Sequence, residues 1–116
     1  MSVALLLGAA VLGAQISAQA PDEVPVDARI PVHGEVRTAD ERRVVRLQEH
    51  YPDGWATVAT ERARRSGRFA FDISSGHLLT TRELRVVAPR AGRLPAARSA
   101  PLRVRVVVPL PDRAGR

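Results

Sequence analysis

Cysteine is absent from this chain of 116 residues, and that absence removes a common support of small exported domains. Without a disulfide, the fold lacks the ~2–4 kcal/mol that one such bridge typically contributes. A lipoprotein anchor is excluded as well, because attachment of the lipid requires a cysteine. The hydrophobic core must therefore stabilise the domain alone.

Lysine is absent too, so all eighteen basic residues are arginines. They outnumber the twelve acidic residues and give a formal net charge of +6. A positive balance favours anionic partners such as wall polymers, acidic glycans, lipid head groups or nucleic acid. For an exported protein we expect an extracellular protein or a cell-wall polymer as partner, and no nucleic acid.

The residue patterns of common enzyme chemistry are missing. His33, His50 and His77 lie on separate segments without metal-ligand spacing, and neither G-x-S-x-G nor a phosphate-binding glycine loop occurs. Aromatic residues make up only 3% of the chain, which leaves little to hold a sugar beside two catalytic carboxylates. We expect no catalytic residues, no metal site and no cofactor; a small hydrolase is the remaining enzymatic alternative.

One long apolar run is present, VALLLGAAVLG at residues 3–13. It has the length of the hydrophobic region of a secretory signal, and Ala18 and Ala20 form an A-x-A cleavage pattern before Pro21. The run is too short for a membrane span, which needs roughly 20 apolar residues. The sequence therefore predicts a signal peptide over residues 1–20 and a secreted or cell-envelope location. No Lys or Arg precedes the run, so either the true start lies upstream or the amino group of Met1 alone supplies the positive charge. An uncleaved anchor is the alternative to the signal peptide.

The remaining chain alternates between apolar and polar residues with a period of two, which is typical of half-buried strands. Prolines and acids make residues 21–28 an extended lead-in, and no segment has helical periodicity. The pattern predicts an antiparallel β-sandwich over residues 29–108 and a Pro-containing tail over residues 109–116. The expected strands are residues 29–37, 43–49, 55–63, 68–74, 84–88 and 101–108.

The inward positions of these strands predict the core. Trp55 and Val58 have opposite parity within one strand, which indicates a β-bulge or a tryptophan packed at the end of the sheet. The predicted core residues are Ile30, Val32, Val36, Val45, Leu47, Val58, Phe69, Phe71, Ile73, Val86, Leu102, Val104 and Val106.

Several short motifs occur in a characteristic order along the chain: Val32-x-Gly34-x-Val36, Val45-x-Leu47-Gln48, Trp55-x-x-Val58-Ala59-Thr60, Ser66-Gly67-x-Phe69-x-Phe71 and Leu84-Arg85-Val86-Val87-Ala88-Pro89. Together they resemble the immunoglobulin-like or fibronectin type III-like domains of secreted actinobacterial proteins. The resemblance implies an all-β Ig-like sandwich of about six to seven strands. It also implies a spacer, adhesion or structural role without an active site.

Two surface features could bind a ligand. Arg62, Arg64, Arg65 and Arg68 surround the Ser66-Gly67 turn of a predicted hairpin and form a possible anion-binding patch, with a solvated turn as the alternative. The loop from residue 50 to residue 55 holds the only Tyr and the only Trp. Tyr51 and Trp55 could stack on sugar rings if both are exposed; alternatively, Trp55 belongs to the core.

The sequence as a whole predicts a non-enzymatic exported Ig-like module with a structural or protein-interaction role at the cell surface. The alternative is a binding module for an anionic cell-wall polymer or polysaccharide, which would use the Arg-rich hairpin. No residue pattern indicates an oligomeric state.

Overall fold

The computed structural model describes residues 16–38 and 42–109, and within these ranges all regular structure is β-strand. The strands are β1 (Ile16–Gln19), β2 (Glu23–Pro25), β3 (Arg29–Val36), β4 (Val44–Tyr51), β5 (Gly54–Arg62), β6 (Arg68–Ser74), β7 (Thr81–Ala88), β8 (Ala97–Arg98) and β9 (Leu102–Val107).

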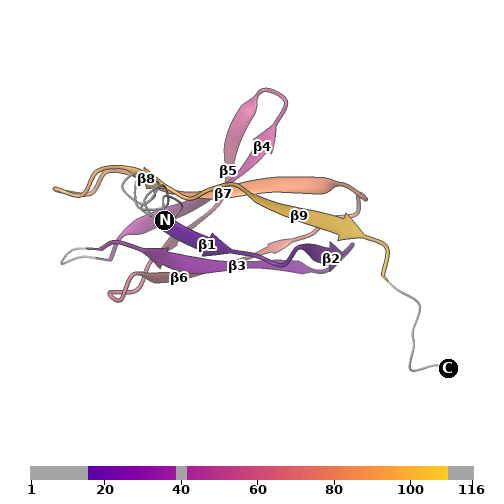
Figure 1. Ribbon diagram of the computed structural model, residues 1–116, viewed down its shortest axis with the longest axis horizontal. Coiled ribbons are helices and arrows are strands. Elements are labelled where there is room, and N and C mark those ends of the chain that lie inside the picture. Colours follow the sequence, from indigo (N-terminus) through magenta and orange to yellow (C-terminus); the bar gives the residue numbers. More distant parts are fainter. Residues whose placement is uncertain (1–15, 39–41, 110–116) are drawn as a thin grey trace, which may run out of the picture.

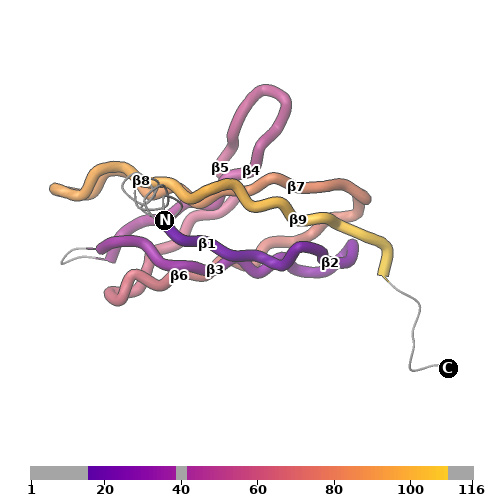
Figure 2. Tube along the Cα trace, viewed as in Figure 1, coloured from indigo at the N-terminus to yellow at the C-terminus, as the bar shows by residue number. Residues whose placement is uncertain are grey.

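The strands form two sheets that pack face to face as two layers (Figure 1). The smaller sheet has the order β1-β3-β6, and the larger has the order β2-β9-β7-β4-β5, with β8 paired to β7. All pairs are antiparallel except β2 with β9. The predicted all-β sandwich is therefore confirmed. The tip of the β4–β5 hairpin projects from the sandwich (Figure 2). Strand β8 lies at one end of the sandwich, and the end of β9 lies at the other.

Alternating apolar side chains from both sheets fill the space between the layers. Ile30 and Val32 from the smaller sheet and Leu47 from the larger are fully buried. Their apolar surface leaves water on folding, which is the main stabilising contribution in a chain without disulfides. The other buried apolar residues are Ile16, Val24, Val36, Val45, Ala63, Phe69, Phe71, Leu84, Val86, Ala88, Ala97, Val104 and Val106. Of the remaining predicted core residues, Ile73 and Leu102 are partly buried against this cluster.

The predicted bulge in β5 is confirmed, and it explains the one core prediction that is wrong. Leu47 pairs with Ala59 whereas its neighbour Gln48 pairs with Thr57, so Val58 has no partner on β4. The extra residue lies outside the regular alternation, and the Val58 side chain is 38% exposed.

The sandwich begins earlier than the expected start at Arg29. Strand β1 pairs with β3, Ile16 is only 5% exposed, and β2 pairs with β9. Gly34 fits this arrangement, because a Cβ there would overlap the carbonyl oxygen of Ser17 on β1. Residues 16–20, the end of the predicted signal peptide, thus lie in the folded unit, whereas residues 1–15 lie outside the described ranges. Small residues in β1 fit both a cleavage site and a closely packed strand.

The connection from β5 to β6 is not the predicted hairpin. β5 pairs with β4 in the larger sheet, and β6 pairs with β3 in the smaller one, so the connection crosses between layers. A turn at Gly67, with φ of 93°, is held by hydrogen bonds from Gly67 N to Arg64 O and from Val36 N to Gly67 O. Two strands with alternating apolar and polar residues on either side of Ser-Gly are compatible with a hairpin and with a crossover between sheets. The alternation shows which face of a strand is buried but not which strand it pairs with.

The C-terminal boundary differs by one residue from the expectation. β9 ends at Val107, and Val108, the last residue of the expected strand, is 60% exposed. Residues 110–116 of the predicted tail lie outside the described ranges.

Candidate anion-binding site

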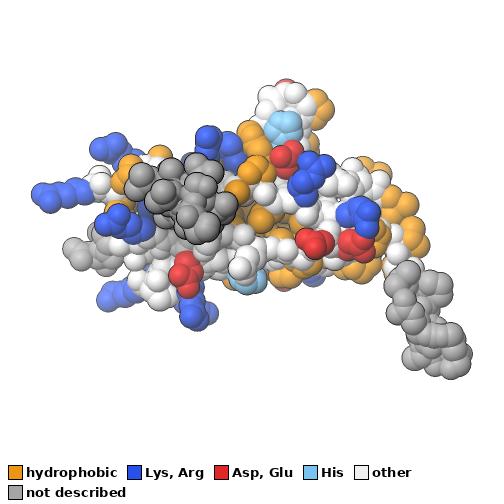
Figure 3. Space-filling model, in the orientation of Figure 1, with side chains coloured by type: hydrophobic (Ala, Val, Ile, Leu, Met, Phe, Trp, Pro, Cys, Tyr) orange, Lys and Arg blue, Asp and Glu red, His pale blue; other side chains and the backbone are white. Residues whose placement is uncertain are grey.

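One end of the sandwich carries many arginines. Antiparallel pairing places the end of β3, the start of β4, the ends of β5 and β7 and the start of β6 at this end. We define the arginine end as residues 37–38, 42–43, 62–68 and 89–96. These residues include nine arginines and neither Asp nor Glu; the intervening residues 39–41, outside the described ranges, have the sequence Ala-Asp-Glu. In Figure 3 the blue side chains gather around this end, on the left.

The structure brings all four arginines of the predicted anion patch to this end, and all four are exposed. Arg68 forms an exposed ion pair with Glu35, with 3.6 Å between Nε and Oε2. Arg62 instead donates a hydrogen bond from Nη1 to the carbonyl oxygen of Arg42, at 3.1 Å. The positions differ in one important respect: Arg62 lines a groove, whereas Arg64, Arg65 and Arg68 do not.

That groove has a volume of about 660 Å3 and lies between the start of β4, the end of β5 and the connection after β7. Its described lining contains no Asp or Glu. We call it the arginine groove, and it is lined by Arg42, Arg43, Val44, Arg46, Arg62, Pro89, Arg90, Ala91, Gly92, Arg93 and Leu94. Sequence reasoning missed it, because nothing in the alternation shows that residues 89–94 lie beside β4.

Backbone carbonyl groups hold two of the groove's exposed guanidinium groups in place. Arg42 donates from Nε to the carbonyl oxygen of Ala63 at 3.2 Å, and Arg62 donates to the carbonyl oxygen of Arg42. A carbonyl oxygen accepts a hydrogen bond but carries no net charge. The two side chains are therefore oriented, and no carboxylate in residues 16–38 or 42–109 forms an ion pair with either of them.

Arg43 is the unusual member of the groove, because its side chain is buried. The residue is 3% exposed, and its guanidinium donates to the carbonyl oxygens of Arg37 (3.0 Å), Pro89 (3.2 Å) and Pro95. Its Nε has no hydrogen-bond partner within the described part of the chain. Burial removes the charged form from water and so lowers the pKa of Arg43 from its ordinary value.

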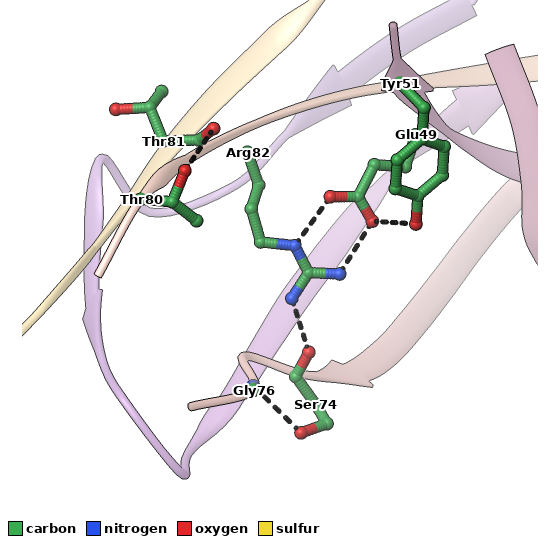
Figure 4. A network of polar contacts seen from close by, with 7 residues as sticks. All are labelled: Glu49, Tyr51, Ser74, Gly76, Thr80, Thr81 and Arg82. Atoms are coloured by element: carbon green, nitrogen blue, oxygen red, sulfur yellow. Dashed lines mark hydrogen bonds and ion pairs between the residues drawn. The ribbon is translucent and has the colours of Figure 1, made fainter. Parts of the chain in front are cut away.

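At the opposite end of the sandwich, arginines pair with carboxylates. There Arg82 on β7 forms a two-pronged ion pair with Glu49 on β4, with Nε–Oε2 at 2.8 Å and Nη2–Oε1 at 2.7 Å (Figure 4). Its Nη1 donates to the carbonyl oxygen of Ser74, at 2.7 Å, at the end of β6 in the other sheet. The hydrogen bond to Glu49 raises the pKa of Arg82 above its ordinary value. This cluster links the two layers.

Further ion pairs occupy the same end, which we call the paired end. Arg29 lies 3.4 Å from Asp72, measured from Nε to Oδ1, and Arg105 pairs with Glu23. His50–Glu83 and His77–Asp27 are also close enough to pair when the histidines are protonated. Blue and red side chains accordingly lie side by side on the right of Figure 3.

Tyr51 and Trp55 do not form a joint sugar platform. Tyr51 pairs with Gly54 and donates from its hydroxyl to Glu49 on the inner face, whereas Trp55 pairs with His50 on the outer face. Trp55 is half-buried and lies outside the core, which corrects the alternative interpretation. The Arg85 guanidinium carbon lies 4.2 Å from the Trp55 ring centroid, close enough for a cation–π contact.

Residues 16–38 and 42–109 hold no group of three or more His, Cys, Asp or Glu arranged to bind a metal ion. They also contain no helix with the length and apolar character needed to cross a membrane.

Comparison with known proteins informs only the fold. No known protein family matches the sequence, and no curated protein matches it. Among solved structures, the sulfur carrier protein SoxY from Chlorobium limicola f. thiosulfatophilum is similar, with a TM-score of 0.55 and 20% sequence identity. The likeness covers 79% of this chain and 75% of that chain. At this identity it supports a shared β-rich fold and carries nothing about function.

Proposed function

We propose that this chain is a non-enzymatic Ig-like module, exported to the cell surface, that binds an anionic cell-wall polymer through the arginine end. The observation that carries the proposal is the separation of charge in the fold. Nine arginines occupy the arginine end without an acid among its described residues; Arg68 pairs with the neighbouring Glu35, and most of the other ion pairs lie at the paired end. Arginines that outnumber the nearby carboxylates on one surface produce a local positive potential that attracts polyanions.

The proposal includes the family of the module and its export. The motifs in β3, β5, β6 and β7 support membership in the Ig-like or fibronectin type III-like domains of secreted actinobacterial proteins. The apolar run at residues 3–13 supports export. A module of this kind contributes contacts to the cell envelope, and the arginine end favours a wall polymer as the contacted molecule.

Co-sedimentation with insoluble cell wall tests the proposal. The wild-type chain should pellet at low salt and stay in solution at high salt, because salt screens interactions between exposed charges. A variant with Arg64, Arg65, Arg90 and Arg93 all changed to Ser should stay in solution at both salt concentrations. Circular dichroism checks that it folds. Equal pelleting of the folded variant and the wild type would overturn the proposed function.

A protein-interaction role is the second candidate, and a separate observation favours it. Leu78, Leu79 and Val108 are 75%, 61% and 60% exposed, and Leu79 and Val108 line one shallow hollow at the paired end. Exposed apolar side chains that gather in one place mark surfaces where proteins associate. Self-association measured by analytical ultracentrifugation, insensitive to salt and lost in Leu79→Ser, would support this role. If the protein stays monomeric at all concentrations, the protein-interaction role does not take the form of self-association.

A further inference from the structure

The arginine groove differs from the rest of the arginine end in its construction. Its arginines come from three segments that are distant in sequence and converge on one hollow, whereas Arg64 and Arg65 project from a single turn. Convergence of this kind lets one ligand group receive hydrogen bonds from several guanidinium groups at once. Scattered surface arginines offer only a diffuse field.

Pre-organisation is the second distinguishing property. Arg42 and Arg62 are fixed by carbonyl oxygens, and those bonds occupy one nitrogen of each guanidinium group. An arginine has five N–H donors, so each retains donors for a ligand. Side chains ordered before binding lose less conformational entropy when the ligand arrives, which strengthens binding.

Arg43 provides the third argument. A buried charge is costly unless an opposite charge compensates it. The groove's described residues offer Arg43 carbonyl oxygens and no carboxylate. An anion in the groove above it would supply the missing negative charge. Arg43 is thus a buried positive charge among the residues that line the hollow.

A second hollow extends the positive surface. Its volume is about 560 Å3, and it shares Arg46 and Pro89 with the arginine groove. Arg85 and Arg98 line it, and Arg85 donates from Nε to the neutral amide oxygen of Gln48 at 2.9 Å, which leaves its charge uncancelled. The arginines therefore continue beyond the groove, as a ligand with repeated charges requires.

These observations define the ligand. We propose that the arginine groove binds phosphate groups of a phosphodiester-linked, non-nucleotide polymer, with successive phosphates reaching Arg46 and then Arg85 and Arg98. This inference rests on the proposed function and names its ligand class. A phosphodiester has two non-bridging oxygens on a tetrahedral phosphorus, so guanidinium groups that approach from different segments of the groove can reach them without lying in one plane, as a carboxylate requires. The planar fork of arginine matches the spacing of these oxygens. No aromatic side chain lines the groove, so the stacking typical of single-stranded nucleic acid binding has no platform there.

The test divides the four arginines of the previous variant into two charge-matched pairs. Arg90→Ser/Arg93→Ser removes two arginines from the groove, and Arg64→Ser/Arg65→Ser removes two from the same end outside it. Isothermal titration calorimetry measures binding of the chain to short poly(glycerol phosphate). The groove pair should weaken binding by about tenfold or more, since charged hydrogen bonds are lost. The control pair should weaken it by no more than about threefold, through the reduced general potential.

Two further probes separate the ligand classes. Polygalacturonate replaces phosphate by carboxylate, and oligothymidylate carries phosphodiesters on a nucleotide chain. Both should bind at least about tenfold more weakly than poly(glycerol phosphate) at the same salt. Equal or tighter binding of polygalacturonate would overturn the phosphate assignment, and equal or tighter binding of oligothymidylate would identify a nucleic-acid surface instead.

The outcomes distinguish this inference from the proposed function. If the two double variants weaken poly(glycerol phosphate) binding equally while cell-wall pelleting remains salt-sensitive, the polymer binds the arginine end diffusely and the groove is not its site. If neither the wild type nor the double variants bind either the wall or the polymer, the proposed function itself fails. Thermal unfolding of each variant confirms that the comparison concerns folded protein.

Discussion

Arginine side chains have different hydrogen-bond acceptors at the two ends of this sandwich. At the paired end, Arg82 meets the Glu49 carboxylate, and its charge is cancelled within the fold. At the arginine end, Arg43 and Arg62 donate to carbonyl oxygens, and among the described residues no carboxylate pairs with either of them. The arginines at the two ends therefore differ in the group that accepts their hydrogen bonds, which is a charged carboxylate for Arg82 and a neutral carbonyl oxygen for Arg43 and Arg62.

The difference has energetic consequences. A buried guanidinium paired with a carboxylate recovers part of its desolvation cost from the attraction between the charges. Arg43 recovers only the energy of hydrogen bonds to carbonyl oxygens. We therefore expect a bound anion to stabilise the folded protein, because a ligand that binds only the folded state stabilises that state.

The largest expected effect concerns the paired end. Arg82→Met should lower the free energy of unfolding by about 3 kcal/mol, because it leaves the nearly buried Glu49 carboxylate without its partner. Urea denaturation measures the loss. Arg42→Met at the arginine end should cost less than about 1 kcal/mol, since it leaves behind only a carbonyl oxygen in partly buried surroundings.

The double variant Glu49→Leu/Arg82→Met is the control for this prediction. Replacing both partners removes the stranded charge, and it should recover most of the lost stability. A loss in Arg82→Met no larger than in Arg42→Met would show that carboxylate pairing does not distinguish the two ends.

The next effect concerns β1, which supports the smaller sheet beside the arginine end. A chain beginning at Pro21 should be less stable than one beginning at Gln15 by about 2 kcal/mol, the approximate contribution of burying a side chain such as Ile16. Gly34→Ala in the longer chain should reproduce much of this loss, because the added Cβ would push β1 away. Equal stability of the two chains would show that β1 contributes nothing, and cleavage after Ala20 would then leave the fold intact.

The main strands and most of the core could be predicted because alternation reports which side chains face inward. The same alternation places Arg43, just before β4, and Glu49 on the inward side, because they have the parity of Val45 and Leu47. It also places Arg82 on the inward face of β7, because Arg82 has the parity of Leu84. A charged residue at an inward position is therefore a sequence-level indication of a pair or a buried charge. The alternation could therefore have identified Arg43 and Arg82 as inward-facing arginines.

Pairing between strands could not be predicted, and the arginine groove depends on it. The groove exists because β5 and β7 both pair with β4, which brings residues 89–94 beside Arg62. Residues 54–74 contain no information on whether β6 joins β5 or β3, since both arrangements satisfy the same alternation. The sequence therefore shows that the β5–β6 connection is rich in arginine, but not which strands pair on either side of it.

Surface charge allows a smaller test of the comparison. Arg90→Ser/Arg93→Ser should raise the midpoint of thermal unfolding by about 2–4 °C at low salt, because it relieves repulsion among like charges. Arg29→Ser at the paired end should not raise the midpoint, because it removes an ion pair with Asp72. Both differences should shrink at high salt. Unfolding midpoints that respond alike at the two ends would mean that the arginine end carries no excess repulsion.

The smallest expected effect is a shift in the titration of Tyr51, the only tyrosine in the chain. Desolvation, the negative charge of Glu49 and the hydrogen bond to Glu49 raise the pKa of Tyr51 above its ordinary value of 10.0. Because the folded-state pKa is the higher one, the stability that this group contributes is complete below pH 10.0 and is lost as the pH rises through the folded-state pKa.

Ultraviolet absorbance of tyrosinate follows this titration without interference from another tyrosine. Glu49→Gln should move the midpoint back toward 10.0, because it removes the nearby negative charge and leaves Arg82 to favour the tyrosinate. Arg62→Ser, at the arginine end, should leave the midpoint unchanged and serves as the matched control. A midpoint that moves in Arg62→Ser, or stays fixed in a folded Glu49→Gln variant, would show that the charge of the paired end is not balanced locally.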